Sequence, residues 1–405
     1  MEESILRSER VLIGLFLLLL MIIPSLIIFA IGIQSHAAVV TQTKAYSPSQ
    51  IASNPIVIDS DADFAALGAT GVGTRADPYV LENLYISTIG TCITVTGTTS
   101  FFRIYNCILE SDPNSPVIQF NDVENGQIVL CEIVGGSSGV EFLSAVDCTI
   151  ANSTIYQCWY GIRLNLSQNC TIAYSRIFNN HRGLLFDSGE FTQVESNTIY
   201  SNNENGLEFA WTTNNNTVVG NRFGWNGMSG FLQENALDHG EDNHFDDGVS
   251  RGNSWSDFNG TTPYSILGTS GNNDSFPELL EDNNVPYIYE HMDTAIDVET
   301  TGNILAWIVS DEFPHQYRIE IDGNPLISSS WNGDSIRVSL DELPVGSYLY
   351  VVTVSDAAGN HANDQVYVNV VSFVLGGIGT ELVMIASGLT VAIFLVMMLI
   401  IKKLS

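Results

Sequence analysis

The sequence is poor in basic residues. Its 405 residues include 14 lysines and arginines but 45 aspartates and glutamates, which gives a formal net charge of −31. This imbalance argues against nucleic-acid binding, because such binding depends on Lys and Arg side chains that neutralise phosphates. Hydrophobic residues still make up 45% of the chain, which is too many for a disordered acidic protein. The composition therefore predicts a folded protein with an acidic exterior and no nucleic-acid partner.

Several common motifs are also missing. The six cysteines form no Cys-x-x-Cys pair and no Cys/His spacing typical of zinc. The Leu/Asn spacing of leucine-rich repeats is absent as well. The pair Gly71 and Gly73 lacks the third glycine and the strand–helix context of a nucleotide-binding loop. These absences argue against zinc-finger, leucine-rich-repeat and dinucleotide-binding proteins.

A long apolar run, 11–33, lies near the N-terminus. It is followed by Ser35 and Ala37, which suit the small-residue positions before a signal cleavage site. The run is also long enough to span a bilayer, so an uncleaved signal anchor remains an alternative. We therefore expect residues 1–37 to be a signal peptide or a signal anchor.

A second apolar run, 382–401, lies near the C-terminus and is followed by Lys402 and Lys403. This pattern predicts a single transmembrane helix with a short cytoplasmic tail, 402–405. We expect a cell-membrane protein with an extracellular ectodomain. The cysteines would then lie in a compartment that permits disulfides.

The middle of the chain repeats itself about every 22 residues. Cys148–Asn169 and Cys170–Phe191 both begin with Cys-Thr-Ile. The most regular column of the repeat is Ile86, Ile108, Ile133, Ile155, Ile177, Ile199 and Phe223. Short alternating apolar runs broken by Asn, Ser and Gly indicate strands rather than helices. The repeat predicts an all-β fold, a parallel β-helix over 56–277 with about 9–10 coils.

Stacking of coils turns each sequence position into a column. Columns rich in Asn and Ser are expected at the corners, where such side chains can hydrogen-bond from coil to coil. Cys107 shares a register with Cys131, and Cys148 shares one with Cys170. Each pair could form a disulfide or a reduced internal ladder, and parallel in-register positions suit disulfide geometry poorly.

The start of the repeat resembles a known family. The stretch GVGTRADPYVLENLYI matches the pattern G-x-G-T followed by D-P-Y-x-(I/L)-E-N at Gly71, Gly73, Thr74, Asp77, Pro78, Tyr79, Glu82 and Asn83. Residues 246–277 are similar to the terminal segment of the same family. The family is that of right-handed β-helix surface proteins related to the NosD copper-processing family and the carbohydrate-binding/sugar-hydrolase repeat group. The resemblance covers about half of the chain and implies a right-handed solenoid.

Residues 285–371 follow the repeat and show alternating strands with regular turn signals, which predicts an Ig-like β-sandwich. The stretch LPVGSYLYVVTVSDAAGN resembles the end of Ig-like surface modules. Such a module next to a membrane is expected to act as a stalk. Linkers are expected at 38–55, 278–284 and 372–381. The combination of repeat family, Ig-like stalk and C-terminal anchor suggests, by resemblance, an archaeal origin.

Aromatic residues provide the first candidate site. Tyr156, Phe178 and Tyr200 follow the isoleucine column and are expected to stack on the outer face, with Trp159 and Trp225 in the corners beyond. Because exposed rings bind the apolar faces of sugars, we predict a shallow glycan-binding platform. The alternative is an aromatic ladder that stabilises the sheet or is covered by a loop.

A cluster of His and Asp residues provides the second candidate site. The stretch LDHGEDNHFDDG contains His239, Asp242, His244 and Asp246, which could bind a divalent metal such as calcium or copper. The alternative is a solvated loop, since part of the stretch matches a structural cap. No other cofactor is expected.

The sequence points to binding rather than to catalysis. Glu141 and Arg163 are expected to form an outward ion pair, and no two outward carboxylates of that strand column lie on adjacent coils, which argues against hydrolysis. We expect non-catalytic binding or adhesion to a surface polysaccharide or glycoprotein. A polysaccharide lyase or hydrolase and a NosD-like copper-handling protein are the alternatives. Sequons for glycosylation occur at Asn152, Asn165, Asn169, Asn215, Asn259 and Asn273.

Overall fold

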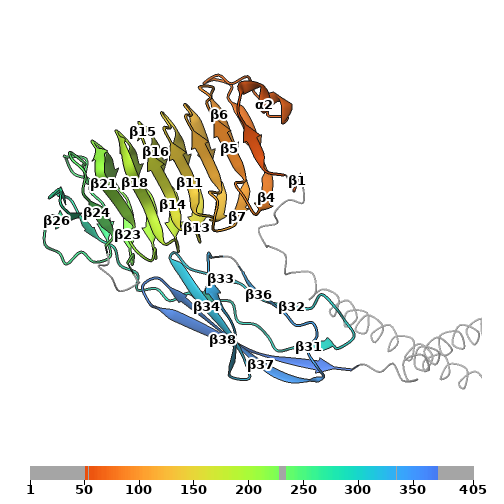
Figure 1. The fold of residues 1–405 in the computed structure, drawn as a ribbon. Coiled ribbons are helices and arrows are strands. Elements are labelled where there is room, and N and C mark those ends of the chain that lie inside the picture. The colour runs from red at the N-terminus through yellow and green to blue at the C-terminus, as the bar shows by residue number, and fades with distance from the viewer. Residues whose placement is uncertain (1–50, 53, 228–233, 334, 373–405) are drawn as a thin grey trace, which may run out of the picture. The chain divides into compact units, whose positions relative to one another are not determined.

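The structure is a computed structural model, shown in Figure 1. It describes residues 51–52, 54–227, 234–333 and 335–372. No helix within these residues is long and apolar enough to cross a membrane. The apolar runs 11–33 and 382–401, on which the signal and transmembrane predictions rest, lie outside the described residues.

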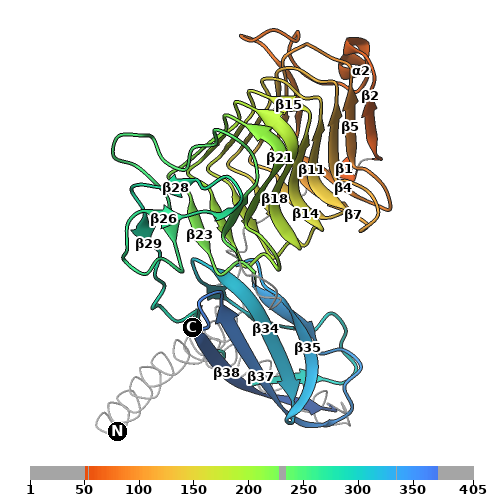
Figure 2. The same cartoon turned by 60° about the vertical axis from the view of Figure 1, so that its left-hand side comes forward.

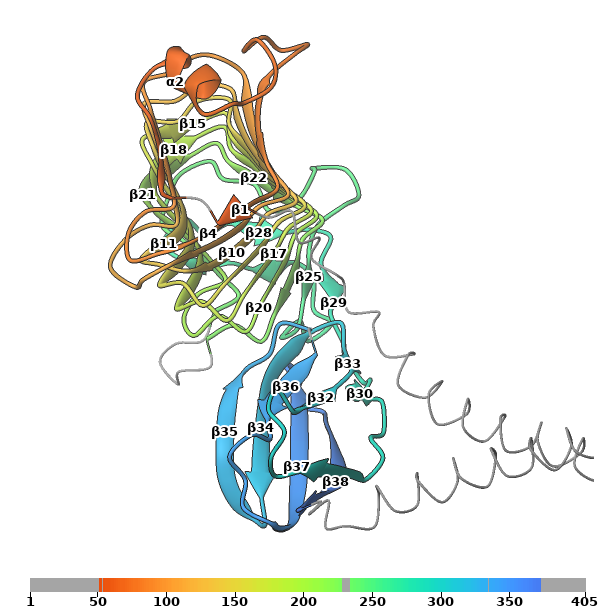
Figure 3. The same ribbon diagram turned by 90° about the vertical axis from the view of Figure 1, so that its right-hand side faces the viewer.

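The repeat region winds as a parallel β-solenoid of about eight turns, which confirms the predicted fold class of this region. Its strands form three parallel sheets, which we name A, B and C, and one passage through all three is one coil (Figures 2 and 3). The number of coils is lower than predicted because the late coils are longer. Partners on adjacent coils are 22 residues apart early on, but Asn221 and Asn253 are 32 apart.

The three sheets take their strands from successive coils, and sheet C ends at β22 while sheets A and B continue beyond it. Sheet A contains β4 (Leu84–Thr88), β7 (Ile108–Ser111), β10 (Glu132–Gly135), β13 (Thr154–Tyr156), β17 (Arg176–Phe178), β20 (Thr198–Tyr200), β23 (Arg222–Gly224), β25 (Ser254–Trp255) and β29 (Glu278–Leu279). Sheet B contains β2 (Ile56–Ile58), β5 (Ile93–Thr96), β8 (Ile118–Asn121), β11 (Ser138–Leu143), β14 (Tyr160–Asn165), β18 (Arg182–Glu190), β21 (Leu207–Asn214), β24 (Ala236–Asp238) and β27 (Leu267–Gly268), with β15 (Ser167–Gln168) beside β18. Sheet C contains β3 (Tyr79–Glu82), β6 (Phe102–Tyr105), β9 (Gly126–Val129), β12 (Thr149–Ala151), β16 (Thr171–Ala173), β19 (Gln193–Glu195) and β22 (Thr217–Val219).

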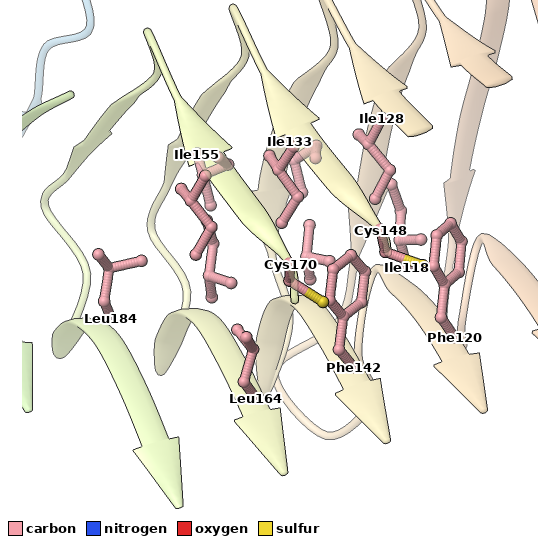
Figure 4. Close-up of a cluster of buried hydrophobic side chains, with 14 of the residues drawn as sticks. Ile118, Phe120, Ile128, Ile133, Phe142, Cys148, Ile155, Leu164, Cys170 and Leu184 are labelled. Carbon is pink, nitrogen blue, oxygen red and sulfur yellow. The ribbon is translucent and has the colours of Figure 1, made fainter. Parts of the chain in front are cut away.

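The core consists of inward columns that stack in register. Figure 4 shows Ile133 and Ile155 on successive coils of sheet A, facing Phe142 and Leu164 of sheet B. One position of the predicted column is wrong: Leu109, not Ile108, pairs with Ile86 and Ile133 and is fully buried. Since side chains alternate along a strand, this shift by one residue turns Ile108 to the outer face.

Buried asparagines form a ladder beside the core, as the sequence predicts. The backbone N–H of Asn197 donates to Oδ1 of Asn221, and that of Asn221 donates to Oδ1 of Asn253, both at 2.9 Å. The side-chain amide of Asn221 also donates to the Val194 carbonyl at 2.7 Å. The ladder therefore supplies partners for backbone groups that the corners leave outside the sheets.

All six cysteines are free and at most 4% exposed. Cys148 and Cys170 point inward on successive coils (Figure 4), one residue before the paired Thr149 and Thr171. Burial raises the pKa of the Cys170 thiol to about 12. The structure thus favours the reduced ladder over disulfides.

A thiol titration tests this arrangement. We expect a chromogenic thiol reagent to react with no cysteine of the native chain, because every Sγ is buried, and with all six after denaturation without reductant. Four or fewer reactive thiols in the denatured chain would show that a disulfide is present and would contradict the ladder.

The first coil is closed by a short helix, α2 (Asp61–Ala66), and is preceded in sequence by β1 (Ile51–Ala52). Ser60 and Asp63 form a capping box at the start of the helix. The helix places the fully buried Phe64 on the rings of Tyr79 (4.7 Å) and Phe102 (5.2 Å). This contact covers the apolar end of the solenoid, as solenoids require.

The last coils carry an antiparallel pair, β26 (Tyr264–Ser265) and β28 (Asn273–Asp274). They are followed by a C-terminal β region with its own core around Trp307. Its five-stranded sheet has the order β31-β38-β37-β34-β35. The strands of the region are β30 (Tyr287–Ile288), β31 (Thr294–Asp297), β32 (Ile304–Trp307), β33 (Val309–Ser310), β34 (Pro314–Ile321), β35 (Asn324–Ser330), β36 (Ile336–Ser339), β37 (Gly346–Asp356) and β38 (His361–Val371). β32 pairs with β36, and β30 pairs with β33.

Candidate functional site

The three aromatic residues of the predicted platform form a stack on sheet A. The ring centroids of Tyr156 and Phe178 are 5.3 Å apart and those of Phe178 and Tyr200 are 4.9 Å apart, with each pair nearly parallel. Tyr156 is 8% exposed, and Phe178 and Tyr200 are fully buried. The expectation that these rings are open to solvent is therefore wrong.

The C-terminal β region covers this stack. Phe313 packs edge-on against Tyr200 at 5.3 Å, and Asn332 Nδ2 donates to the Tyr156 hydroxyl at 3.1 Å. Arg222 pairs with Glu312 beside them. The three rings therefore form a covered aromatic ladder, which was the alternative to an open glycan platform. A separate β region, and not a loop, covers the ladder.

The two corner tryptophans lie in different settings. Trp159 is 53% exposed and lies on the His181 ring at 3.9 Å. Trp225 is half-buried against Phe313 at 4.9 Å, within the covered cluster. The two tryptophans therefore do not form one exposed surface with the aromatic stack. Of the five residues predicted for the platform, Trp159 is the one that is exposed to a ligand.

The structure does not assemble the candidate metal residues into one site. The His239 ring stacks on Trp211 and its Nδ1 contacts Thr269 Oγ1 at 3.1 Å. Asp246 instead accepts the backbone N–H groups of Gly248 and Ser275, each at 2.8 Å. Backbone amides thus satisfy this carboxylate as in a loop cap. In the described part of the chain, no group of three metal-ligating side chains includes His239, Asp242, His244 or Asp246.

Another acidic cluster is closer to metal-binding geometry. One carboxylate oxygen from each of Asp282, Asp311 and Asp356 lies within 4.8 Å of the others. Oδ2 of Asp282 is buried without a hydrogen-bond partner. Burial, and then the neighbouring carboxylates of Asp282 and Asp356, raise the pKa of Asp311 to about 6. These are the described residues that could hold a divalent cation.

The outward carboxylates of sheet B are held by arginines. The predicted pair of Arg163 with Glu141 is present at 3.4 Å, and Arg163 also binds Asp187 at 2.6 Å. On the next coils, Arg182 bridges Glu204 (2.6 Å) and Glu208 (3.1 Å). Carboxylates that accept from guanidinium groups in this way are satisfied structurally and are poorly placed as a free acid–base pair.

The six sequon asparagines lie at the surface. Asn152, Asn169, Asn215, Asn259 and Asn273 are exposed, and Asn165 is half-buried. Asn169 donates to Oδ1 of Asp147. Glycosylation at these positions stays a prediction.

A groove of about 580 Å³ lies on the outer face of sheet C, and the sequence reasoning did not find it. We call it the sheet C groove. Its lining is mostly polar and consists of Arg75, Pro78, Phe101, Phe102, Arg103, Asn125, Gln127, Asp147, Thr149, Asn169, Thr171 and Gln193. It spans the strands from β6 to β19.

Five polar side chains form a track along the floor of the groove. The strand registers place Arg103, Gln127, Thr149, Thr171 and Gln193 one above another on successive coils. Neighbouring strands are about 4.8 Å apart, so the track runs along the solenoid axis at that interval. Arg103 Nε donates to Gln127 Oε1 at 2.9 Å. Among the described residues, the side chains of Thr149, Thr171 and Gln193 have no protein hydrogen-bond partner.

The loop between Gly71 and Pro78 forms one end of the groove. Gly71 has φ +91°, and a Cβ at this position would lie 1.9 Å from the Pro78 carbonyl oxygen. Gly73 accepts the Phe101 N–H at 3.0 Å, and the loop places Arg75 in the groove lining. The glycines of the G-x-G-T motif are therefore needed for a tight loop.

The repeated sequence did contain a signal for this groove. The outward positions of sheet C can be recognised once the inward column Ile104, Ile128 and Ile150 is aligned. Each outward residue directly precedes one of these isoleucines in the sequence. The predicted glycan platform consists of aromatic residues, and this column of Arg, Gln and Thr lies outside it.

Comparison with known proteins supports the fold. A family model described as a right handed beta helix region matches residues 70–236, which include the sheet C strands from β3 to β22 and all of the groove-lining residues. No curated protein matches the chain. The matched segment is thus similar to a right-handed β-helix, and its handedness agrees with the resemblance seen in the sequence.

Proposed function

We propose that this protein binds glycans at the cell surface without catalysis, and that the sheet C groove is the binding site. The observation that carries this proposal is the track of polar side chains with free hydrogen-bonding capacity along the solenoid axis. A linear glycan presents hydroxyl groups at regular intervals, and Thr and Gln side chains can both donate to and accept from them. The apolar Phe101 and Pro78 at one end offer a surface for a sugar ring.

The composition of the groove favours binding over hydrolysis. Glycoside hydrolysis generally uses two carboxyl groups that flank the scissile bond. Asp147 is the one carboxylate among the residues that line the groove, and its Oδ1 accepts from Asn169. A lyase or hydrolase therefore remains the weaker candidate.

We also propose how the solenoid is held at the cell surface. We propose that the chain is secreted through its N-terminal segment and anchored by residues 382–401, and that the C-terminal β region is an Ig-like module near the membrane. The resemblance to the carbohydrate-binding group supports the glycan ligand. Copper is less well supported, because no three-ligand group in the described residues includes the predicted metal residues.

A binding measurement with a matched control tests the groove. The full chain in detergent is screened against an oligosaccharide panel as wild type, as Thr149→Ala/Thr171→Ala and as Thr94→Ala/Thr96→Ala. The second pair lies on β5 of sheet B, half-buried like the first and outside the groove. We expect the groove variant to bind about tenfold more weakly, since two hydrogen bonds are lost. Equal binding by both variants would reject the groove as the site.

A further inference from the structure

Two arginines lie in the sheet C groove of a chain that has only 14 basic residues. Arg103 uses Nε for Gln127, and no protein partner accepts from its two terminal amino groups within the described residues. Arg75, in the loop at the groove's end, has no ion-pair or hydrogen-bond partner in the described part of the chain.

Four of the seven other arginines that the structure describes form ion pairs with carboxylates. Those that form ion pairs are Arg163, Arg182, Arg222 and Arg318. The other three, Arg176, Arg251 and Arg337, donate to hydroxyl or backbone oxygens. Among the described arginines, Arg75 is the one whose side chain has no partner, and Arg103 has an amide oxygen but no carboxylate. The guanidinium group is a fork of donors that matches carboxylate and other oxyanions bidentately, so two unpaired arginines in one groove suit an anionic ligand group.

The charge of the groove is unevenly distributed. Both arginines belong to the β3–β6 end, whereas Asp147 lies beside Thr149, two coils away from Arg103, or about 10 Å at the strand spacing. A glycan with an anionic group on every sugar would place one of them near Asp147. A glycan that carries its anionic group on one unit, with neutral units beside it, fits both ends.

We infer that the ligand is an acidic glycan, with a carboxylate or sulfate bound by Arg75 and Arg103 and neutral units along Thr149, Thr171 and Gln193. This inference rests on the proposed function and adds the ligand class. It assigns the two arginines to specificity and the threonines and Gln193 to the contact with hydroxyl groups.

The test uses oligosaccharides in matched charged and uncharged forms. The panel contains tetrasaccharides with one uronate, their carboxyl-reduced counterparts, versions with one sulfate, and fully uronate oligomers. Wild-type chain in detergent is compared with Arg103→Gln, Arg75→Gln and the control Arg337→Gln, an exposed arginine of β36 with the same change of charge. Binding constants come from calorimetry.

The comparison of charged with neutral forms separates the acidic-glycan inference from the broader glycan proposal. We expect the single-uronate or the single-sulfate form to bind at least about tenfold more tightly than its neutral counterpart, and this difference to vanish in Arg103→Gln but not in Arg337→Gln. The comparison between uronate and sulfate identifies the anion. Equal binding of charged and neutral forms would overturn this inference and leave the groove as a glycan site. Binding to no member of the panel would contradict both proposals.

Discussion

Replacing Asn221 by leucine is expected to lower the free energy of unfolding by about 3 kcal/mol, one of the largest losses from a single polar side chain in this fold. Asn221 is fully buried, and its Oδ1 accepts from the backbone and side-chain amides of Asn197 at 2.9 and 3.0 Å. Leucine fills similar space but offers no acceptor. The Asn197 backbone N–H would then be buried without a partner, at about 1–3 kcal/mol, and the Val194 carbonyl and the Asn197 side-chain amide would each lose one hydrogen bond.

Thermal unfolding of the full chain in detergent, followed by circular dichroism, measures this loss. The expected decrease in Tm is roughly 6–12 °C for a domain of this size. Asn203→Leu is the matched control, since Asn203 is exposed and lies outside the ladder, and its expected effect is within about 0.5 kcal/mol. Equal, small effects of both substitutions would contradict the structural role of the ladder.

Replacing Phe178 by alanine is expected to cost about 3–5 kcal/mol, because a fully buried ring leaves a cavity. The ring lies between Tyr156 and Tyr200 and shares their cluster with Phe313 and Leu280. Its loss therefore weakens both the stack on sheet A and the packing of the C-terminal β region on it.

Limited proteolysis separates these two effects. Cleavage after Leu280 is expected to be faster in Phe178→Ala than in wild type, because the packing that covers this segment is loosened. Phe191→Ala serves as control, since Phe191 is 53% exposed and its truncation leaves no cavity. Unchanged stability and cleavage in Phe178→Ala would mean that the stack is not buried in solution.

The sequence was sufficient to predict the solenoid because coil stacking acts on every repeat. A period held over many coils forces identical side chains into columns, so the inward isoleucines and the corner asparagines could be located without a structure. The exception was Ile108, where two adjacent apolar residues left the register ambiguous and Leu109 took the inward position.

The candidate site was harder to predict, because exposure depends on contacts between distant segments. Tyr156 and Phe178 alternate with buried residues and were rightly placed on the outer face of sheet A. Nothing in the repeat indicates that Phe313, 135 residues after Phe178, packs on that face. The sheet C groove also depends on contacts between separate segments, because Arg75 lines it from a loop outside the strands.

One pair of variants distinguishes ligand binding in the sheet C groove from binding on exposed aromatic side chains. Thr171→Trp would fill the groove at β16, whereas Trp159→Ala removes the exposed tryptophan of the predicted platform. For the tightest-binding glycan of the panel, we expect Thr171→Trp to weaken binding by at least about tenfold and Trp159→Ala to leave it within about twofold. Loss of binding in Trp159→Ala with full binding in Thr171→Trp would show that the ligand binds at Trp159 and not in the groove.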